Sequence, residues 1–243
     1  MRKLHIIMPM AGEGNRFKKE GWTVPKPLIQ LNGMPLFQHA IKSVFANDID
    51  LKYSFIVRQE HIDKCQIDSI IRSYLPDANI FSVEKTTRGA VETCLMAETV
   101  IEDEDAIIVM DCDLEFRSQT FMNIIYEILL QPEKETQGGA VVSFESDDPR
   151  YSYAELGENG YVIRTAEKEV ISNHALCGAY LFSSGKRFKQ ISRQLIDEPV
   201  FKKPEYYVSL LYNYLLANHE IVRLAQLDEY YSYGTPEELK RYL

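Results

Sequence analysis

Short apolar runs recur along the first half of the chain, and longer stretches with helical periodicity separate them. The expected strands cover residues 4–9, 53–57, 79–83, 105–110 and 139–144, and the expected helices cover 36–46, 62–74, 89–99 and 121–130. Continuous apolar strands that alternate with helices are typical of a mostly parallel sheet covered on both faces. With 243 residues, 45% of them hydrophobic, the chain is long enough to bury one such core.

The pattern changes after residue 147. Strand-like segments at 151–156, 161–165 and 175–182 follow one another with turn signals between them, and helical patterns return at 185–195 and 205–217. The tyrosines of the last stretch, EYYVSLLYNYLL, are expected to pack one helix face. We therefore predict an α/β, Rossmann-like fold in which helices flank a mostly parallel central sheet that carries a small antiparallel lobe. We expect a single domain over 1–243, with a first half at 1–145 and a second half at 146–243.

The connection after the first expected strand is unusually long. It runs over residues 9–26, whereas a plain strand-to-helix connection needs about two to six residues. Gly12 and Gly14 permit positive φ and let backbone N–H groups approach an anion. Arg16 offers a planar fork suited to phosphate, and Lys26 stands between two prolines that restrict its backbone. These features suit a triphosphate, and a basic, flexible surface loop is the alternative.

Three acids follow the apolar run DAIIVM. Asp111, Asp113 and Glu115 alternate along the chain, so an extended backbone places them on one face. A cation between them would relieve their repulsion. Carboxylates suit Mg²⁺, which takes one or two of them and completes its shell with phosphates and water. Solvated acids before a helix capped by Ser118 are the alternative.

In folds of this type, ligands bind beyond the carboxyl ends of the parallel strands. That rule places residues 9–26, Arg88, residues 111–115 and residues 146–153 along one rim of the predicted sheet. The glycine loop and the acids are therefore expected to share one site.

The long loop lacks two familiar phosphate-binding motifs, because Phe17 stands where GxxxxGK[ST] and GxGxxG each need a glycine. Its GxGxR pattern, followed by PKPL, instead resembles the sugar-phosphate nucleotidyltransferases, also called nucleotide-sugar pyrophosphorylases, in the branch that begins PMAG. The resemblance covers nearly the whole chain, through Gly89-Ala90, Asp111-Cys112-Asp113, Glu167-Lys168, Gly178-Ala179-Tyr180 and GTPEEL. It implies a GT-A-like nucleotidyltransferase fold in a short single domain. It also implies an enzyme that condenses an NTP with a phosphorylated acceptor and releases pyrophosphate.

The resemblance also implies roles for matching positions. Arg16 and Lys26 are the expected catalytic residues, and Asp113 is the expected Mg²⁺ ligand, with Asp111 as the second choice. The expected nucleotide-binding residues are Met10, Ala11, Gly12, Gly14, Thr87 and Gly89, and the expected acceptor-binding residues are Glu167, Lys168 and Gly178. Threonine hydroxyls at 86–87 favour a pyrimidine NTP, and a threonine that caps the following helix is the alternative.

One position departs from the family pattern. Relatives commonly carry an acidic second metal ligand where this chain has Ser232. Either the site uses a single protein carboxylate there, or Asp228 or Glu229 reaches in.

Several functions fit these motifs. A sugar 1-phosphate is the first choice of acceptor, and the resemblance then implies nucleotide-sugar synthesis for surface polysaccharides. A cytidylyltransferase for a non-sugar phosphate, such as phosphocholine or a phosphorylated amino-acid derivative, is an alternative. Asp111-Cys112-Asp113 also matches the D-x-D motif of metal-dependent glycosyltransferases. A non-catalytic nucleotide-binding protein is the last alternative.

Composition narrows the partners and the location. The net charge of −9 argues against a nucleic-acid partner. No apolar stretch approaches the roughly 20 residues of a membrane span, and the apolar run in MRKLHII is too short for a signal peptide. The four scattered cysteines favour reduced thiols in a cytoplasmic protein. The oligomeric state stays open, including a homo-oligomer.

Overall fold

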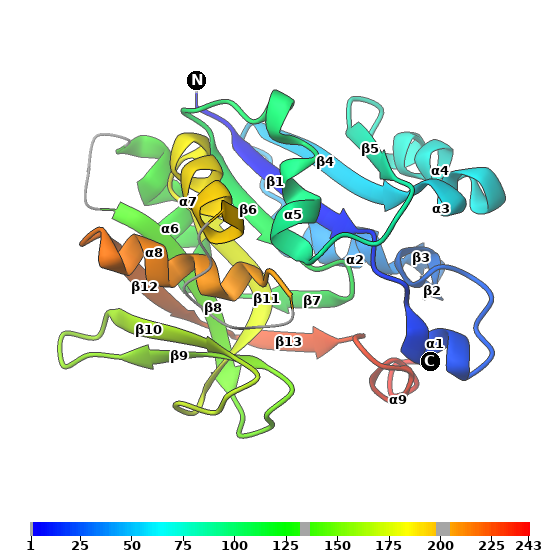
Figure 1. Cartoon of the computed structure of the whole chain (residues 1–243). Helices are drawn as coiled ribbons and strands as arrows, with labels where there is room; N and C mark the ends of the chain where they lie inside the picture. The colour runs from blue at the N-terminus through cyan, green and yellow to red at the C-terminus, as the bar shows by residue number, and fades with distance from the viewer. Residues whose placement is uncertain (1, 132–136, 198–204) are drawn as a thin grey trace.

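A nine-stranded sheet forms the centre of the computed structural model, which describes residues 2–131, 137–197 and 205–243 (Figure 1). The parallel part follows the order β6-β1-β4-β5, with bounds Ala106–Met110, Leu4–Met10, Leu51–Arg58 and Asn79–Val83. The second half of the chain supplies β8 Gln137–Glu145, β9 Ser152–Leu156, β10 Val162–Glu167, β11 His174–Phe182 and β12 Ile221–Gln226. β11 runs antiparallel to β6, so the predicted antiparallel lobe continues the central sheet. The predicted α/β class is confirmed.

Helices cover both faces of this sheet because its strands are apolar on both sides. In β1, Ile6 and Met8 pack into one core with α2 Leu36–Lys42, α3 Gln59–Cys65, α4 Ile67–Tyr74 and α6 Gln119–Leu130. Ile7 packs into the opposite core, with α5 Ala90–Leu95, α7 Gly185–Asp197 and α8 Leu211–Ala217. The predicted cap of α6 is confirmed, since the Ser118 hydroxyl accepts a hydrogen bond from the Phe121 N–H at 3.1 Å.

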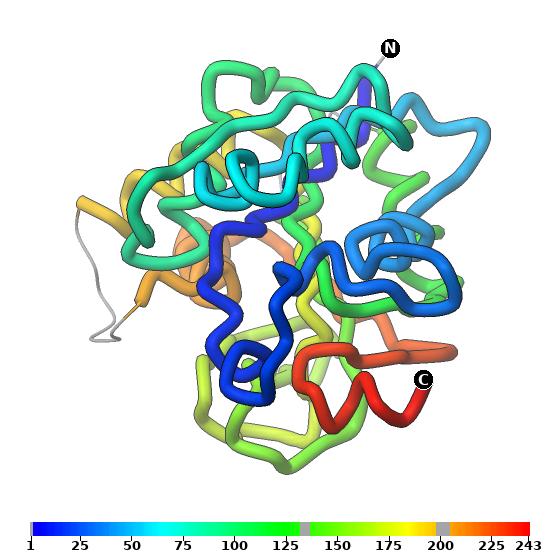
Figure 2. The backbone as a smooth tube through the Cα atoms, turned by 90° about the vertical axis from the view of Figure 1, so that its right-hand side faces the viewer, coloured from blue at the N-terminus to red at the C-terminus, as the bar shows by residue number. Residues whose placement is uncertain are grey.

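A third, smaller core joins the glycine loop to the C-terminal segment. Phe17 and Leu239 both pack into it, so the N-terminal loop lies beside the C-terminal segment, as Figure 2 shows. The Lys240–Glu20 ion pair, at 2.6 Å, spans the same contact. The elements here are α1 Asn15–Lys19, the 3-10 helix Lys26–Leu28, β2 Gln30–Leu31, β3 Met34–Pro35, β7 Leu114–Arg117, β13 Glu229–Ser232 and α9 Pro236–Leu239. The sequence patterns had not indicated α1, β7, β12, β13 or α9.

Several predicted helices are shorter or interrupted: α2 ends at Lys42 and α5 at Leu95, before the expected residues 46 and 99. The helix expected over 62–74 is broken at Gln66, whose φ of 51° ends α3 and lets α4 start in a new direction with Ile67 and Ile71 in the core. The helix expected over 205–217 begins only at Val208, with a 3-10 turn before α8. Tyr206 cannot join it, because its N–H donates to the Arg88 carbonyl at 2.9 Å and its carbonyl accepts from the Val91 N–H at 3.1 Å.

The state of the cysteines and the character of the helices bear on two expectations from the sequence. All four cysteines are unpaired thiols; Cys94, Cys112 and Cys177 are buried and Cys65 is half-buried. Within the described ranges, no helix combines the length and the apolar character that crossing a membrane requires.

Candidate active site

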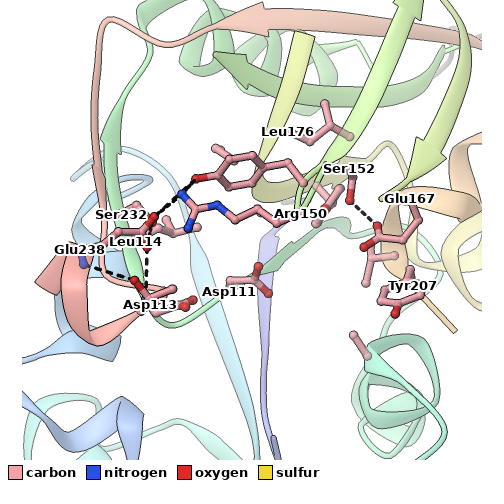
Figure 3. A pocket seen from close by; sticks show the side chains of 18 of the residues that line it. Asp111, Asp113, Leu114, Arg150, Ser152, Glu167, Leu176, Tyr207, Ser232 and Glu238 are labelled. Atoms are coloured by element: carbon pink, nitrogen blue, oxygen red, sulfur yellow. Dashed lines mark hydrogen bonds and ion pairs between the residues drawn. The ribbon is translucent and has the colours of Figure 1, made fainter. Parts of the chain in front are cut away.

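A cavity of about 280 Å³ lies where the carboxyl ends of β1 and β6 meet the antiparallel strands. Its wall includes Arg16, Asp111, Asp113, Glu167 and Gly178, which come from four different segments. In Figure 3, Asp111 lies between two groups of labelled side chains: Asp113, Ser232 and Glu238 on one side, and Ser152, Glu167 and Tyr207 on the other. These residues therefore lie together at the expected edge of the sheet.

Asp111 is held in place by the neighbouring strand β11. Its backbone N–H donates to the Gly178 carbonyl at 2.9 Å. Gly178 has a φ of 95°, and a Cβ atom there would collide with the Asp111 carboxylate. A glycine is therefore required at position 178 by both backbone conformation and space, whereas the sequence had suggested only acceptor binding for it.

Lys26 and Asp113 bring the glycine loop and the acidic strand end together. The Lys26 ammonium donates to Asp113 Oδ2, and the two side chains are 25% and 16% exposed. Their partial burial strengthens the attraction relative to a surface pair. The glycine loop and the acids thus lie in contact, as the sequence predicted.

The prediction that all three acids share one face is wrong for Glu115. The chain bends at Cys112 and Asp113 between β6 and β7, which breaks the alternation. The Glu115 carboxylate instead bonds His39 Nδ1 at 2.6 Å and accepts from the Tyr233 hydroxyl at 3.3 Å. It contributes to packing between β7 and α2 and does not line the cavity.

The two remaining acids form a donor set that suits a divalent cation. Loss of bulk water around Asp111, together with the charge of Asp113, raises the pKa of the Asp111 carboxyl, so a positive ion at this point would be stabilised. Among the described residues, no group of three or more His, Cys, Asp or Glu is placed to hold a metal. Mg²⁺ fits such a site because one or two carboxylates suffice when phosphates and water complete its shell.

The glycine loop contributes to two cavities. Arg16, on α1, lines the main cavity, while Gly12, Gly14 and Lys26 line a neighbouring one of about 150 Å³ beside α3. Gly14 has a φ of 66°, which explains a glycine just before α1. The side chains of Met10 and Ala11 are buried in the two sheet cores, so only their backbone groups are left for a ligand.

The loop that contains Thr87 and Gly89, which were expected to bind the nucleotide, bonds partly to the protein itself. Thr87 donates to the Gly89 carbonyl at 3.1 Å and shares a 2.6 Å hydrogen bond with Thr93, so its hydroxyl is engaged with α5. Thr87 is not the cap of α5, whose N-cap is Gly89. A Cβ atom on Gly89 would collide with the Tyr206 backbone, which gives this glycine a packing role. Neither residue lines the main cavity, and the neighbouring Ala90 does.

Arg88, also expected on the rim, is engaged elsewhere. Its guanidinium pairs with Glu92 at 2.8 Å and stacks 4.9 Å from the Tyr206 ring centre. It does not line the main cavity.

Glu167 and Lys168 occupy different positions at the opposite wall. Glu167 is 6% exposed and accepts hydrogen bonds from the Ser152 hydroxyl and, at 2.8 Å, from the Ser209 hydroxyl. Lys168 is exposed and donates to the Tyr207 hydroxyl at 2.7 Å. Tyr207 lines the cavity whereas Lys168 does not, so the expectation that the tyrosines of EYYVSLLYNYLL pack a helix face is wrong for Tyr207.

The cavity is also lined by side chains that the sequence had not assigned to it, among them Arg150, Tyr230 and Glu238. Arg150 donates to Glu238 at 2.6 Å and stacks on Tyr151. Glu238 is the acid of a capping box that starts at Thr235, and the T-x-x-E spacing was the readable signal for it. Arg150 falls within the segment 146–153 placed on the rim, but nothing in its local sequence marks it.

Ser232, which stands where relatives commonly carry an acid, lies in the cavity wall. Its hydroxyl donates to Glu238 at 2.8 Å, within the cavity wall. The alternative that Asp228 or Glu229 reaches into the site is wrong. Asp228 accepts from the Gln119 N–H at 2.7 Å and Glu229 pairs with Arg117 at 3.2 Å, and neither lines the cavity.

Comparison with known proteins adds an independent observation. Residues 5–215 match the sequence model of a family described as nucleotidyl transferase. A 2-C-methyl-D-erythritol 4-phosphate cytidylyltransferase of Leptospira interrogans is 30% identical over 115 residues, which make up 47% of this chain and 46% of that protein. The match thus spans less than half the length of this curated relative.

Solved structures match over nearly the whole chain. A nucleoside-diphosphate-sugar pyrophosphorylase of Vibrio cholerae RC9 is 26% identical, with a TM-score of 0.81 and coverage of 98% of this chain and 99% of that one. The inositol-1-phosphate CTP transferase of T. maritima is 15% identical, with a TM-score of 0.74 and coverage of 100% and 94%, which shows a shared fold.

Proposed function

The chain belongs to the nucleotidyl transferase family and is an enzyme of nucleotidyl transfer, and we propose that it joins an NTP to a phosphorylated small molecule. A sugar 1-phosphate is the first candidate for this acceptor. The products would be an NDP-linked compound and pyrophosphate. One observation carries this proposal: Arg16, Asp111, Asp113 and Glu167 line one cavity, and Lys26 bonds Asp113 at its edge. Cations from the glycine loop and carboxylates from β6 are thus available to the same ligand.

The nucleotide would lie along the glycine loop. Backbone groups of residues 10–14 and the loop at 86–89 would hold the base and ribose, and Arg16 and Lys26 would stabilise charge on the triphosphate. The cytidylyltransferase among the curated relatives supports a pyrimidine NTP.

Magnesium would be held by Asp113 and Asp111. When bound, the ion would neutralise negative charge on the triphosphate. Lys26 contacts Asp113, so its ammonium would stand close enough to the same site to pair with a phosphate of the nucleotide.

In the proposed reaction the residues around the cavity would position the reactants, and no general base would be needed. A phosphomonoester has a second pKa near 6, so it is largely dianionic at pH 7 and already nucleophilic. An oxygen of the acceptor phosphate would form the new bond to the α-phosphorus, and the bond to the bridging oxygen of the leaving pyrophosphate would break. Arg16 would stabilise the charge that moves onto this leaving group.

The acceptor would occupy the side of the cavity that β9, β10 and β11 form. Glu167 would accept hydrogen bonds from acceptor hydroxyls, and Gly178 leaves room beside Asp111. Lys168, which donates to the Tyr207 hydroxyl at the rim, would stabilise the charge of the acceptor's phosphate. The Vibrio cholerae pyrophosphorylase supports a sugar phosphate.

A non-sugar acceptor is the second candidate. Four tyrosines line the cavity together with the carboxylates of Asp111, Glu167 and Glu238; they are Tyr151, Tyr180, Tyr207 and Tyr230. Aromatic faces and carboxylates suit a cationic nitrogen, as in phosphocholine or a phosphorylated amino-acid derivative.

A matrix of NTPs against phosphorylated acceptors, with released pyrophosphate as the readout, tests the function. We expect turnover that needs Mg²⁺ and stops with EDTA. Arg16→Ala should reduce kcat by about 10²–10³-fold, while Lys19→Ala, on the same helix, serves as the matched control. Glycosyl transfer from an NDP-sugar without pyrophosphate release would overturn the proposal, and so would NTP binding without turnover on any acceptor.

A further inference from the structure

Arg58 occupies a position from which one side chain can reach two loops. It is the last residue of β4, which lies between β1 and β5 in the sheet. The parallel register pairs Met10 with Val57, so Arg58 stands beside the point where β1 ends and the glycine loop begins. Its side chain is 14% exposed.

The guanidinium of Arg58 makes use of this position. Its Nη1 donates to the Ala11 carbonyl at 3.3 Å and to the Thr86 hydroxyl oxygen at 3.0 Å. Ala11 belongs to the loop after β1, and Thr86 belongs to the loop after β5. One half-buried cation thus joins both segments of the proposed nucleotide site.

The contact continues through Thr86 to the middle of the glycine loop. The Thr86 hydroxyl donates to Glu13 Oε1 at 3.1 Å, and Glu13 Oε2 accepts from the Asn15 amide at 2.7 Å. Glu13 stands between Gly12 and Gly14, so its carboxylate lies in a loop proposed to hold phosphates. These hydrogen bonds keep it turned toward the loop after β5.

We propose that Arg58 is a positioning residue for the nucleotide, with Thr86 as its relay, and this inference rests on the proposed function of the loop. The network of Arg58, Thr86 and Glu13 sets the spacing between residues 10–14 and 86–89. It also holds the Glu13 carboxylate away from the triphosphate, which that charge would otherwise repel. The affinity for the NTP therefore depends on residues that do not line the main cavity.

Binding without acceptor tests this inference directly. Trp22 is the single tryptophan of the chain and lines the same small cavity as Gly12 and Gly14, so its fluorescence can report Mg–NTP binding. Arg58→Gln and Thr86→Val should each raise the Kd and KM for the NTP by about tenfold, the effect of losing one hydrogen bond to a charged group. The kcat and the acceptor KM should change by less than about twofold. Thr86→Ser keeps the hydroxyl and should bind like the parent.

A double variant separates positioning from a loss of fold. Glu13→Gln in the Thr86→Val background removes the charge that the relay restrains, so it should restore part of the NTP affinity. If Arg58→Gln melts at a much lower temperature than the parent, Arg58→Lys takes its place in the binding measurements. Equal increases in both KM values, or no restoration by Glu13→Gln, would overturn the inference while the parent still turns over. A parent chain that binds no NTP would instead overturn the proposed function, and the inference with it.

Discussion

The ammonium of Lys26 and the carboxylate of Asp113 form an ion pair between residues 87 positions apart, where the glycine loop meets the end of β6. Burial opposes the charge on the lysine, but the charge and hydrogen bond of Asp113, together with Cys112 and Asp111, outweigh that effect, so the pKa of Lys26 is raised. Two groups proposed to bind different parts of a magnesium–triphosphate complex therefore neutralise each other when no ligand is bound.

Breaking this pair from one side should cost stability. Lys26→Met or Asp113→Asn leaves one charge without its partner, so each should lower the free energy of unfolding by about 1–3 kcal/mol. We expect values near the lower end of this range, because the pair is partly exposed to water. The double variant should regain most of that loss. Turnover should stay low in all three, because both residues act on the substrate. Urea unfolding and pyrophosphate release measure the two effects, and strictly additive losses would show that the pair is not coupled.

Gly178 should tolerate no side chain. Gly178→Ala combines a positive φ with a collision against Asp111, so we expect a loss of about 1–3 kcal/mol and at least tenfold lower turnover. Gly160→Ala is the control, since Gly160 has a φ of 77° with open space around it. It should lose only about 1 kcal/mol and keep its activity. Equal activities of the two variants would argue against a role for Asp111 in catalysis.

Glu167→Gln should affect the acceptor and spare the nucleotide. The amide oxygen can still accept from Ser152 and Ser209, so the wall should keep its shape while the charge is lost. We expect the acceptor KM to rise by about tenfold, with the NTP KM unchanged. Glu169→Gln, at an exposed neighbouring position, should change neither constant. A rise in the NTP KM alone would show that Glu167 acts on the nucleotide and not on the acceptor.

Stability should fall in mild acid because of His5. This residue is fully buried against Ser54, and burial, helped by Lys52, lowers the pKa of its imidazole from 6.5 to about 3. The unfolded chain takes up a proton below pH 6.5 and the folded chain does not, so the His5 contribution is complete above pH 6.5 and is lost progressively toward pH 3. Urea unfolding should show about 2 kcal/mol less stability at pH 5 than at pH 7 from this residue. His5→Gln should remove that part of the pH dependence, and an unchanged difference would assign it to other groups.

Part of the site could be predicted because its signals are local. Gly12, Gly14 and Arg16 follow a largely apolar, buried strand, and Asp111 and Asp113 follow another. Parallel strands end at one edge of a sheet, so strand order alone brings these ends together. Arg150 and Tyr207 carry no such signal, since each enters the cavity from a segment whose direction depends on distant contacts.

The amino-acid sequence by itself determined the layered α/β architecture, because continuous apolar strands must be covered on both faces. It also determined which loops carry the cations and the acids. Only the tertiary structure decided which of those side chains face the cavity. A bend after β6 turns Glu115 toward His39, and pairing with Tyr206 draws the loop at 88–91 against the second half of the chain. Such choices depend on contacts between residues far apart in sequence, and a local pattern does not contain them.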